Sequence, residues 1–415
     1  MPVTDIIAVL LIFAATGIIG LFITRLVNIP YSLILVGLGF LLALSVEAFG
    51  WDSGIRASNF QDLMLFVLLP VLIFEAAFSL DSKLLFRFMP NVLTLATIGL
   101  LVSTVATAVF IFYGIGHPGF PFIAALITGA VISATDPVAV VAQLKALNAP
   151  AELNVLIEGE SLFNDATAIA LFTILVGIGL GTVEADVTDG VIQFMKIFFG
   201  GVAVGVVMGY LFALTLHIFS VTLPGLILVT IVLSYGSFYI GEHFLHVSGI
   251  VAVLFAAIVF KKVAAGQLAE LEHQVHHVWE SLGFIANVFV FVLLGLVITV
   301  EMFTERWIAI VLAIIAATLA RTVAVYVSVW LNGVTVGQPT DSRYPPIMIW
   351  GGLRGAVTIA LVLSLPTELP YWWTIQSIGF GVVLFTLLVQ ATTNPWLVKK
   401  ILSKPPESKK RTPHG

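Results

Sequence analysis

The chain has no cysteine and very few charged side chains. The absence of cysteine excludes disulfide bonds, thiol catalysis and cysteine-ligated metal sites. Only 10% of the 415 residues are charged, whereas 60% are apolar and the mean hydropathy is +1.11. A soluble domain carries about 25% charged residues, because its surface must face water. The composition therefore excludes a soluble enzyme and a disordered chain, and it indicates a polytopic membrane protein.

The chain also lacks the excess of positive charge that nucleic-acid binding requires. The net charge is −5, and a single run, the tail, is rich in basic residues. These are Lys399, Lys400, Lys404, Lys409, Lys410 and Arg411. No nucleic-acid partner is therefore expected. No Gly-x-Ser-x-Gly or His-Glu-x-x-His motif is present, and no enzyme activity is predicted.

Thirteen segments are long and apolar enough to cross a bilayer, which takes about 20 residues per helix. They are residues 5–25, 31–49, 61–80, 90–114, 120–144, 152–180, 191–216, 223–242, 247–260, 276–300, 307–331, 344–365 and 372–398. The predicted fold class is an all-α polytopic membrane protein with 13 transmembrane helices.

Positive charge predicts the orientation of these helices, because cytoplasmic loops carry the excess of Lys and Arg. If the loops alternate, one side holds 13 basic residues and the other holds 3. The larger set is Arg25, Lys83, Arg87, Lys145, Lys261, Lys262, Arg343 and the six of the tail; the smaller is Arg56, Lys196 and Arg306. We therefore predict a multi-pass protein of the inner (plasma) membrane, with its N-terminus outside and its C-terminus in the cytoplasm.

Two of the segments contain residues that interrupt a helix. Asp136 precedes Pro137 in the fifth, and proline removes a backbone donor while it pushes the preceding residue out of helical geometry. Gly351 and Gly352 precede Arg354 in the twelfth, and a third glycine follows. The two segments are seven apart, as two inverted repeats require, and paired interrupted helices are typical of a transporter's binding site. Glycines that only allow close helix packing are the alternative.

The sixth segment places carboxylates and a hydroxyl group on shared helix faces. Ser161 and Asp165 are four residues apart and lie on one face, whereas Glu160 and Asn164 share the neighbouring stripe. Oxygen ligands of this kind suit a hard cation such as Na+, with a proton as competitor. A protonated, hydrogen-bonded carboxyl group with a structural role is the alternative for Asp165.

Arg321 lies near the middle of the eleventh segment, where an unpaired guanidinium would be very costly. Its expected partner is an acid on a neighbouring helix, either Glu158 or Glu160. This pair is expected to be structural, and it would supply a fixed positive charge near the site.

Four further titratable residues are weaker candidates. Glu75 falls toward the end of the third segment, where it could face water. His273, His276 and His277 precede the tenth segment in a predicted cytoplasmic loop. These histidines could sense pH, since histidine titrates near neutrality, or they could form a solvated helix face.

Three motifs at these positions resemble a known family. They are SATDPVAV (133–140), EGESLFND (158–165) and GGLRGAV (351–357), with weaker matches in 69–80 and 279–287. Across residues 5–400 the chain resembles the NhaP-type cation/proton antiporters, which are related to the animal sodium/hydrogen exchangers and to the plant Salt Overly Sensitive exchangers. The resemblance implies exchange of cytoplasmic Na+ (or Li+) for external H+, in the service of pH homeostasis and salt tolerance.

The resemblance also implies a role for each matching residue. Asp165 would bind the cation and the proton in turn, and Asn164 before it is the pattern of electroneutral members. The other residues implied to form the Na+ site or to lie beside it are Asp136, Ser161, the backbone of Thr135 and Glu75.

For the surroundings of the site, the resemblance implies that Glu160 pairs with Arg321. Arg354 would compensate the charges of helix ends at the crossover of the two broken helices. The breaks would lie at Pro137, Gly351 and Gly352. No cofactor is implied beyond the transported Na+ and H+.

The implied assembly is a homodimer in the lipid bilayer. Residues 1–89 and 221–303 would form an interface domain, 90–182 and 304–400 a moving core domain, 183–220 a linker helix, and 401–415 a short cytoplasmic tail. A K+/H+ antiporter of the same fold and a cation channel that uses the same acidic cavity are the alternatives. An intramembrane aspartyl protease using Asp136 and Asp165 ranks last, because neither aspartate follows a Gly-x-Gly-Asp pattern.

Overall fold

The computed structural model describes residues 3–27, 29–49, 63–117, 119–182, 187–218, 222–335 and 340–403. Within these ranges the chain is helical throughout and contains no strand. Nine helical segments of the described chain are long and apolar enough to cross a membrane. The chain is therefore an all-helical, multi-pass membrane protein, as predicted, while the count of thirteen crossings stays a prediction. Outside the described residues lie Arg56, Lys404, Lys409, Lys410 and Arg411.

One to three helical elements occupy each of the predicted segments. The first part contains α1 (Val3–Thr24), α2 (Tyr31–Phe49), the π-helix η1 (Leu63–Leu68), α4 (Leu69–Ser79), α5 (Ser82–Thr94), the π-helix η2 (Leu95–Gly99), α6 (Leu100–Ile115), α7 (Phe122–Ser133), α8 (Val138–Ala146), α9 (Ala151–Gly179) and α10 (Val187–Ile218). The second part contains α11 (Leu223–Tyr239), the π-helix η3 (Ile240–Phe244), α12 (Gly249–Val263), α13 (Ala265–Leu268), α14 (Glu272–Val297), α15 (Val300–Thr335), α16 (Tyr344–Trp350), α17 (Ala356–Leu363), α18 (Trp372–Phe385), the π-helix η4 (Thr386–Gln390) and α19 (Ala391–Leu402).

Several helices begin earlier than the hydropathy predicts. The helix α14 starts at Glu272, so His273, His276 and His277 lie in its first turns. The sequence had placed them in a loop before the helix. The helix α5 starts at Ser82, where the Asp81 side chain accepts hydrogen bonds from two backbone N–H groups. Hydropathy misses the start of α14 because its first turns are polar, and the start of α5 because charged residues are mixed with apolar ones there. The Asp81 cap still stabilises the first turn of α5.

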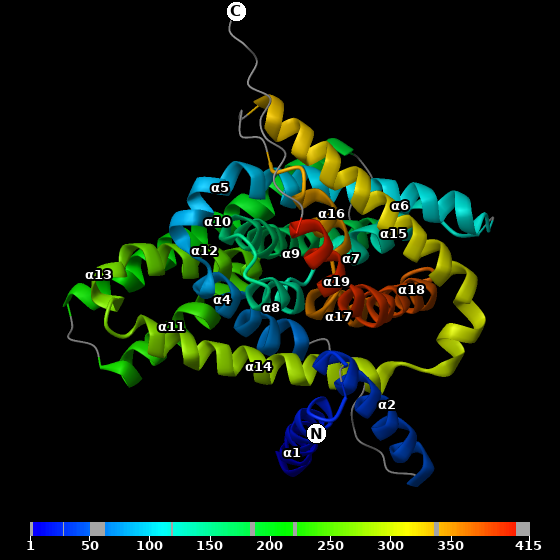
Figure 1. The fold of residues 1–415 in the computed structure, drawn as a ribbon, viewed down its shortest axis with the longest axis horizontal. Helices are drawn as coiled ribbons and strands as arrows, with labels where there is room; N and C mark the ends of the chain where they lie inside the picture. The colour runs from blue at the N-terminus through cyan, green and yellow to red at the C-terminus, as the bar shows by residue number, and fades with distance from the viewer. Residues whose placement is uncertain are drawn as a thin grey trace, which may run out of the picture.

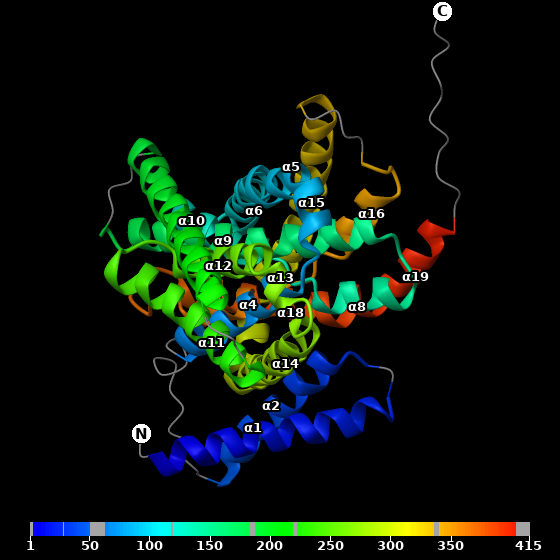
Figure 2. The ribbon, with the colours of Figure 1, turned by 90° about the vertical axis from the view of Figure 1, so that its left-hand side faces the viewer.

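The helix α9 lies in the middle of the bundle, and most of its residues are buried (Figure 1). The helices α5, α7, α8 and α10 pack against it, whereas α1 and α2 lie along one side of the bundle against α14 (Figure 2). The buried residues of α9 include Glu160, Ser161, Asn164 and Asp165 as well as large apolar side chains. These four polar residues are therefore enclosed by protein.

The two predicted helix breaks are present. The helix α7 ends at Ser133, Ala134 is extended, and α8 begins only after Pro137. The helices α16 and α17 are separated by residues 351–355, which are not helical. The breaks touch, since the backbone N–H of Asp136 donates to the carbonyl of Leu353 at 2.8 Å. Four helix ends thus meet inside the bundle.

Candidate functional site

Asp136 lies where two helices begin, and its carboxylate caps both of them. Its Oδ1 accepts a hydrogen bond from the N–H of Val138 at 3.0 Å, at the start of α8. Its Oδ2 accepts one from the N–H of Ala356 at 3.3 Å, at the start of α17. A helix N-terminus carries a partial positive charge and unpaired N–H groups, both of which a carboxylate satisfies. One aspartate therefore stabilises the starts of two half-helices that are more than 200 residues apart in sequence.

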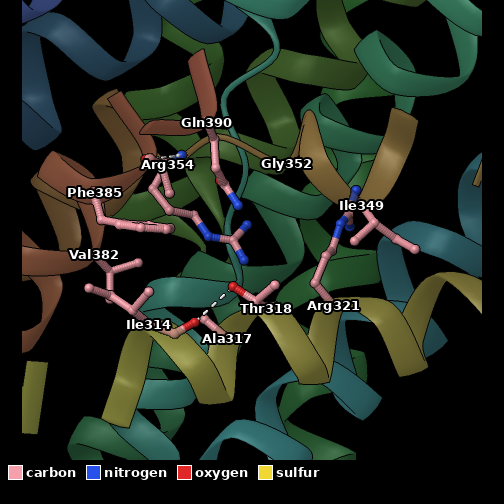
Figure 3. A pocket seen from close by; sticks show the side chains of 11 residues that line it. Ile314, Ala317, Thr318, Arg321, Ile349, Gly352, Arg354, Val382, Phe385 and Gln390 are labelled. Atoms are coloured by element: carbon pink, nitrogen blue, oxygen red, sulfur yellow. Dashed lines mark hydrogen bonds between the residues drawn. The ribbon is translucent and has the colours of Figure 1, made fainter. Parts of the chain in front are cut away.

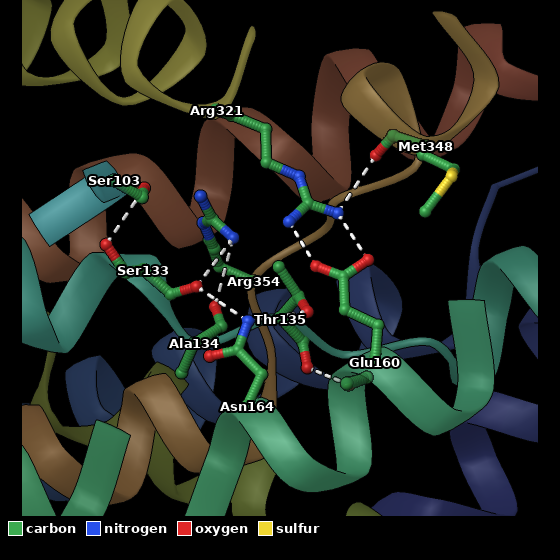
Figure 4. A network of polar contacts seen from close by, with 10 residues as sticks. Ser103, Ser133, Ala134, Thr135, Glu160, Asn164, Arg321, Met348 and Arg354 are labelled. Carbon is green, nitrogen blue, oxygen red and sulfur yellow. Dashed lines mark hydrogen bonds and ion pairs between the residues drawn. The ribbon is translucent and has the colours of Figure 1, made fainter. Parts of the chain in front are cut away.

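Two arginines satisfy the opposite ends of the broken helices (Figure 4). Arg354 donates from Nη1 to the carbonyls of Ser133 at 3.4 Å and Ala134 at 3.1 Å, where α7 ends. Arg321 donates from Nη2 to the carbonyl of Met348 at 3.2 Å, in the last turn of α16. Helix C-termini are partially negative, so a guanidinium is favourable there. The charges at the crossover match the polarity of the helix ends that they contact.

Arg321 also forms the ion pair for which the sequence leaves two partners open. Its Nη1 and Nη2 donate to Oε1 and Oε2 of Glu160, the latter at 2.9 Å, and both residues are buried. Glu158 is two residues away and therefore points to another side of α9. A bidentate geometry of this kind is the strongest form of a guanidinium–carboxylate contact. The pair joins α9 to α15 across the middle of the bundle.

The polar face of α9 contacts the non-helical backbone between α7 and α8. The Ser161 hydroxyl donates to the carbonyl of Thr135. The Asn164 amide donates from Nδ2 to the carbonyl of Ser133 at 3.2 Å and to the Thr135 hydroxyl at 3.4 Å. The structure thus brings the predicted residues of segments five and six together.

Two oxygen atoms at this face have no hydrogen-bond donor among the described residues. They are Oδ1 of Asn164 and Oδ1 of Asp165, whose side chain is 8% exposed. A buried acceptor without a partner costs free energy, more so when it is charged. A cation or a proton at Asp165 would remove that cost. The arrangement is therefore suited to a small positively charged ligand.

The Glu75 side chain forms its hydrogen bond within α4 and not with residues of the two helix breaks. Ser79, one turn later on α4, donates to its Oε1 at 3.1 Å, and Gly283 of α14 lies close against its side chain. Among the described residues no hydrogen bond connects Glu75 with Asp165 or Asp136. The structure therefore does not join Glu75 directly to the other predicted ligands.

A small cavity, with room for about one water molecule, adjoins the two arginines (Figure 3). Arg354 and Gln390 line it on one side, and Arg321 and Thr318 border it from α15. Buried atoms without a hydrogen-bond partner in the described chain include Nε of Arg321 and Oε1 of Gln390. Water fits a polar cavity of this kind. A water molecule held in this cavity would lie beside the two arginines.

Comparisons with known proteins agree with this architecture. Residues 9–400 match the family model described as "Sodium/hydrogen exchanger, transmembrane". The chain belongs to the sodium/hydrogen exchanger family. It is 33% identical over 405 residues to the Na(+)/H(+) antiporter NhaH of Halobacillus dabanensis, covering 96% of this chain and 98% of the relative. It is 34% identical over 377 residues to the Na(+)/H(+) antiporter ApNhaP of Aphanothece halophytica, covering 90% of this chain and 70% of the relative.

The fold of this exchanger-family chain is also that of a solved structure. The sodium proton antiporter MjNhaP1 of Methanocaldococcus jannaschii superposes with a TM-score of 0.80 over 96% of this chain and 100% of the other, at 19% sequence identity. The relatives are transporters and not enzymes, so the protease alternative is wrong.

The sequence did not point to the hydroxyl groups that hold the end of α7 in this exchanger-family chain. The Ser133 hydroxyl donates to Ser103 at 3.0 Å and accepts a bond from Thr104 at 3.4 Å. Gly129 packs against the Thr104 backbone so closely that a side chain there would overlap it. Hydroxyl-bearing residues in an apolar helix are the sequence signal for such contacts, but that signal does not name the partner.

We predict that Gly355→Ala abolishes the function of this site while the protein still folds. A Cβ at residue 355 would overlap the Asp136 carboxylate, which must then leave the N–H of Ala356. Gly333→Ala is the matched control, because the space around Gly333 on α15 is open. Initial rates of ion exchange and melting temperatures of both variants test this. Exchange at the wild-type rate by Gly355→Ala would show that the double cap is dispensable.

Proposed function

We propose that the chain is an electroneutral Na+/H+ antiporter, which exchanges cytoplasmic Na+ (or Li+) for external H+ by alternating access. The two ions compete for Asp165, and the activity serves pH homeostasis and salt tolerance. The names of the relatives support the substrates. The observation that carries the proposal is the buried Asp165, whose Oδ1 has no donor among the described residues, next to a crossover of broken helices.

The charges at the crossover support an exchange of one ion for one. The groups concerned are Asp136, Glu160, Asp165, Arg321 and Arg354. Three carboxylates and two guanidinium groups give a net charge of −1 when all are ionised. One Na+ or one H+ brings this to zero, whereas both together would leave an excess positive charge in a low-dielectric interior, which is costly. Either ion therefore displaces the other.

We place the Na+ site among oxygen atoms of α9 and of the helix break that α9 contacts. Asp165 supplies the charge, and Asn164, Ser161 and Thr135 contribute neutral oxygens from the α9 face and the break that it contacts. The Asp136 carboxylate, which caps α8 and α17, attracts the cation electrostatically without binding it directly. Glu75 contacts the cation through a water molecule. Oxygen atoms are the ligands that a hard cation prefers.

Alternating access requires one part of the bundle to move relative to another. We assign the movement to the core predicted from the sequence, residues 90–182 and 304–400, against an interface formed by 1–89 and 221–303, with 183–220 as the linker. Thirteen crossings, two inverted repeats that contain the breaks, a homodimer, and a cytoplasmic C-terminus complete the proposal. A core that moves only when Asp165 is neutralised cannot leak Na+ without returning H+.

A counter-transport assay tests the proposed function. The full-length protein is reconstituted in vesicles that contain a pH dye, and Na+ is added outside. Internal alkalinisation is expected, at a rate independent of a membrane potential imposed with K+ and valinomycin. Na+ flux without proton movement would identify a channel, and a rate that scales with the potential would contradict one-for-one exchange. A response to K+ that equals the response to Na+ would identify a K+/H+ antiporter.

A further inference from the structure

Three basic side chains and an aromatic ring form an exposed cluster away from the crossover, on α5 and α12. Lys83, Phe86 and Arg87 are spaced i, i+3 and i+4 on α5 and therefore share one helix face. All three are exposed, and Phe86 is 43% exposed. Lys262, in the last turn of α12, places its Nζ 3.9 Å from the centre of the Phe86 ring. Both helices lie on the left of the bundle in Figure 1.

The positive charges of this cluster form no close ion pair within the described part of the chain. None of Lys83, Arg87 and Lys262 has a carboxylate within 4.0 Å there, although Glu152 at the start of α9 attracts Arg87 from a greater distance. Asp81 caps α5, and Glu272 pairs with Lys261, which also donates to two carbonyls at the end of α4. Their close contacts within the protein are with aromatic rings, Lys262 with Phe86 and Arg87 with Phe88, which leaves their N–H groups open to an anion.

The position of the cluster indicates that its ligand is a lipid headgroup. It lies where α5 begins, at the end of the bundle that the distribution of positive charge assigns to the cytoplasm, and the membrane-spanning part of the helix follows. Lipid headgroups occupy that level, and anionic headgroups attract basic side chains there. Arginine binds phosphate oxygens through two N–H groups, and a phenyl ring prefers the boundary between headgroups and acyl chains.

We propose that Lys83, Arg87 and Lys262, with Phe86, bind the headgroup phosphate of an anionic phospholipid of the cytoplasmic leaflet. The lipid joins two parts of the fold, because α5 continues through η2 into α6 as one helical rod, whereas Lys262 belongs to α12. In the proposed function, on which this consequence rests, α5 runs without a break from the interface range (1–89) into the moving core (90–182), whereas α12 lies wholly within the interface range (221–303). A lipid held by both alters the rate of exchange.

Binding is tested independently of transport. The purified full-length protein in a neutral detergent is titrated with short-chain phosphatidylglycerol, phosphatidylcholine or inorganic phosphate, and the melting temperature is recorded. Phosphatidylglycerol alone is expected to stabilise the protein. The double variant Arg87→Gln/Lys262→Gln should bind it roughly 25-fold more weakly, since each basic residue near a membrane surface contributes about a fivefold preference.

The matched control is Lys399→Gln/Lys400→Gln. It removes two positive charges from the same predicted side, including Lys400, which lies 4.7 Å from the Trp396 ring. The control should bind phosphatidylglycerol as the wild type does. Equal binding by the Arg87/Lys262 variant and the wild type would overturn the site, and equal stabilisation by inorganic phosphate would identify a free anion as the ligand.

The transport consequence is measured in vesicles with an increasing fraction of phosphatidylglycerol in phosphatidylcholine. The exchange rate of the wild type and of the control is expected to change with that fraction, and the rate of Arg87→Gln/Lys262→Gln is expected not to. A parallel response of all three proteins would overturn the coupling of the lipid to exchange. If no protein exchanges ions in any vesicle, the proposed function fails, while the melting experiment still decides the lipid site.

Discussion

Asp165→Asn is expected to reduce Na+/H+ exchange to the rate of empty vesicles. Asparagine has the size of aspartate, but it can neither take up a proton nor neutralise a cation. The substitution also removes the one negative charge in excess at the crossover, so the crossover is neutral without an ion, and a bound cation would leave an excess positive charge. Proton movement driven by Na+ in vesicles, recorded with an internal pH dye, is the measurement.

The Asp165→Asn substitution is not expected to lower the stability of the folded protein. Asp165 is buried, and its Oδ1 has no donor in the described chain, so loss of the charge removes a desolvation cost and breaks no bond to that atom. The melting temperature of Asp165→Asn is therefore expected to equal or exceed that of the wild type. Asp189→Asn, at an exposed position on α10, is the control for substitution of an aspartate. Robust Na+-driven proton movement by Asp165→Asn would refute the assignment of the carrier carboxylate.

Separating Glu160 from Arg321 is expected to be the most destabilising change of charge in the protein. Either Glu160→Gln or Arg321→Met leaves one buried charge without its partner, which costs about 3–5 kcal/mol. The double variant Glu160→Gln/Arg321→Met leaves no such charge and should recover most of the loss. The part not recovered reflects the cap on the Met348 carbonyl, about 1 kcal/mol.

Unfolding in detergent, by heat or by denaturant, measures the stability of the three variants against the wild type. The decisive quantity is the coupling between the two substitutions, obtained from the double-mutant cycle. Additive losses in the double variant would mean that the two side chains do not stabilise the fold as a pair. The pair would then serve the site by its charge alone.

Much of this structure could be predicted from residue types in their local order. The apolar runs predicted the helices, because a spanning helix needs a fixed length of apolar sequence. Pro137 and the glycines at residues 351–355 predicted both breaks, because proline and glycine act on the backbone that carries them. The start of α14 was missed, because His273, His276 and His277 continue a helix in polar sequence.

The partners of the site could be predicted only as alternatives. Spacing on one helix shows which side chains share a face, but it leaves Arg321 with a choice between Glu158 and Glu160. Gly355 likewise reads as a helix breaker in the sequence, whereas the structure shows that its missing side chain makes room for the Asp136 carboxylate. These contacts depend on how helices from distant parts of the chain pack.

By itself the sequence determined that this is a membrane protein with a few charged residues at bilayer depth and with two helices that break. Each of these properties follows from composition or from the local backbone. The tertiary structure decided what the charges do. The Asp136 carboxylate reaches an N–H group 220 residues away, the two arginines contact the opposite helix ends, and Asp165 lies beside them with an oxygen that no described donor meets. Charges that the membrane makes costly are stable there because distant helix ends supply the complementary partial charges.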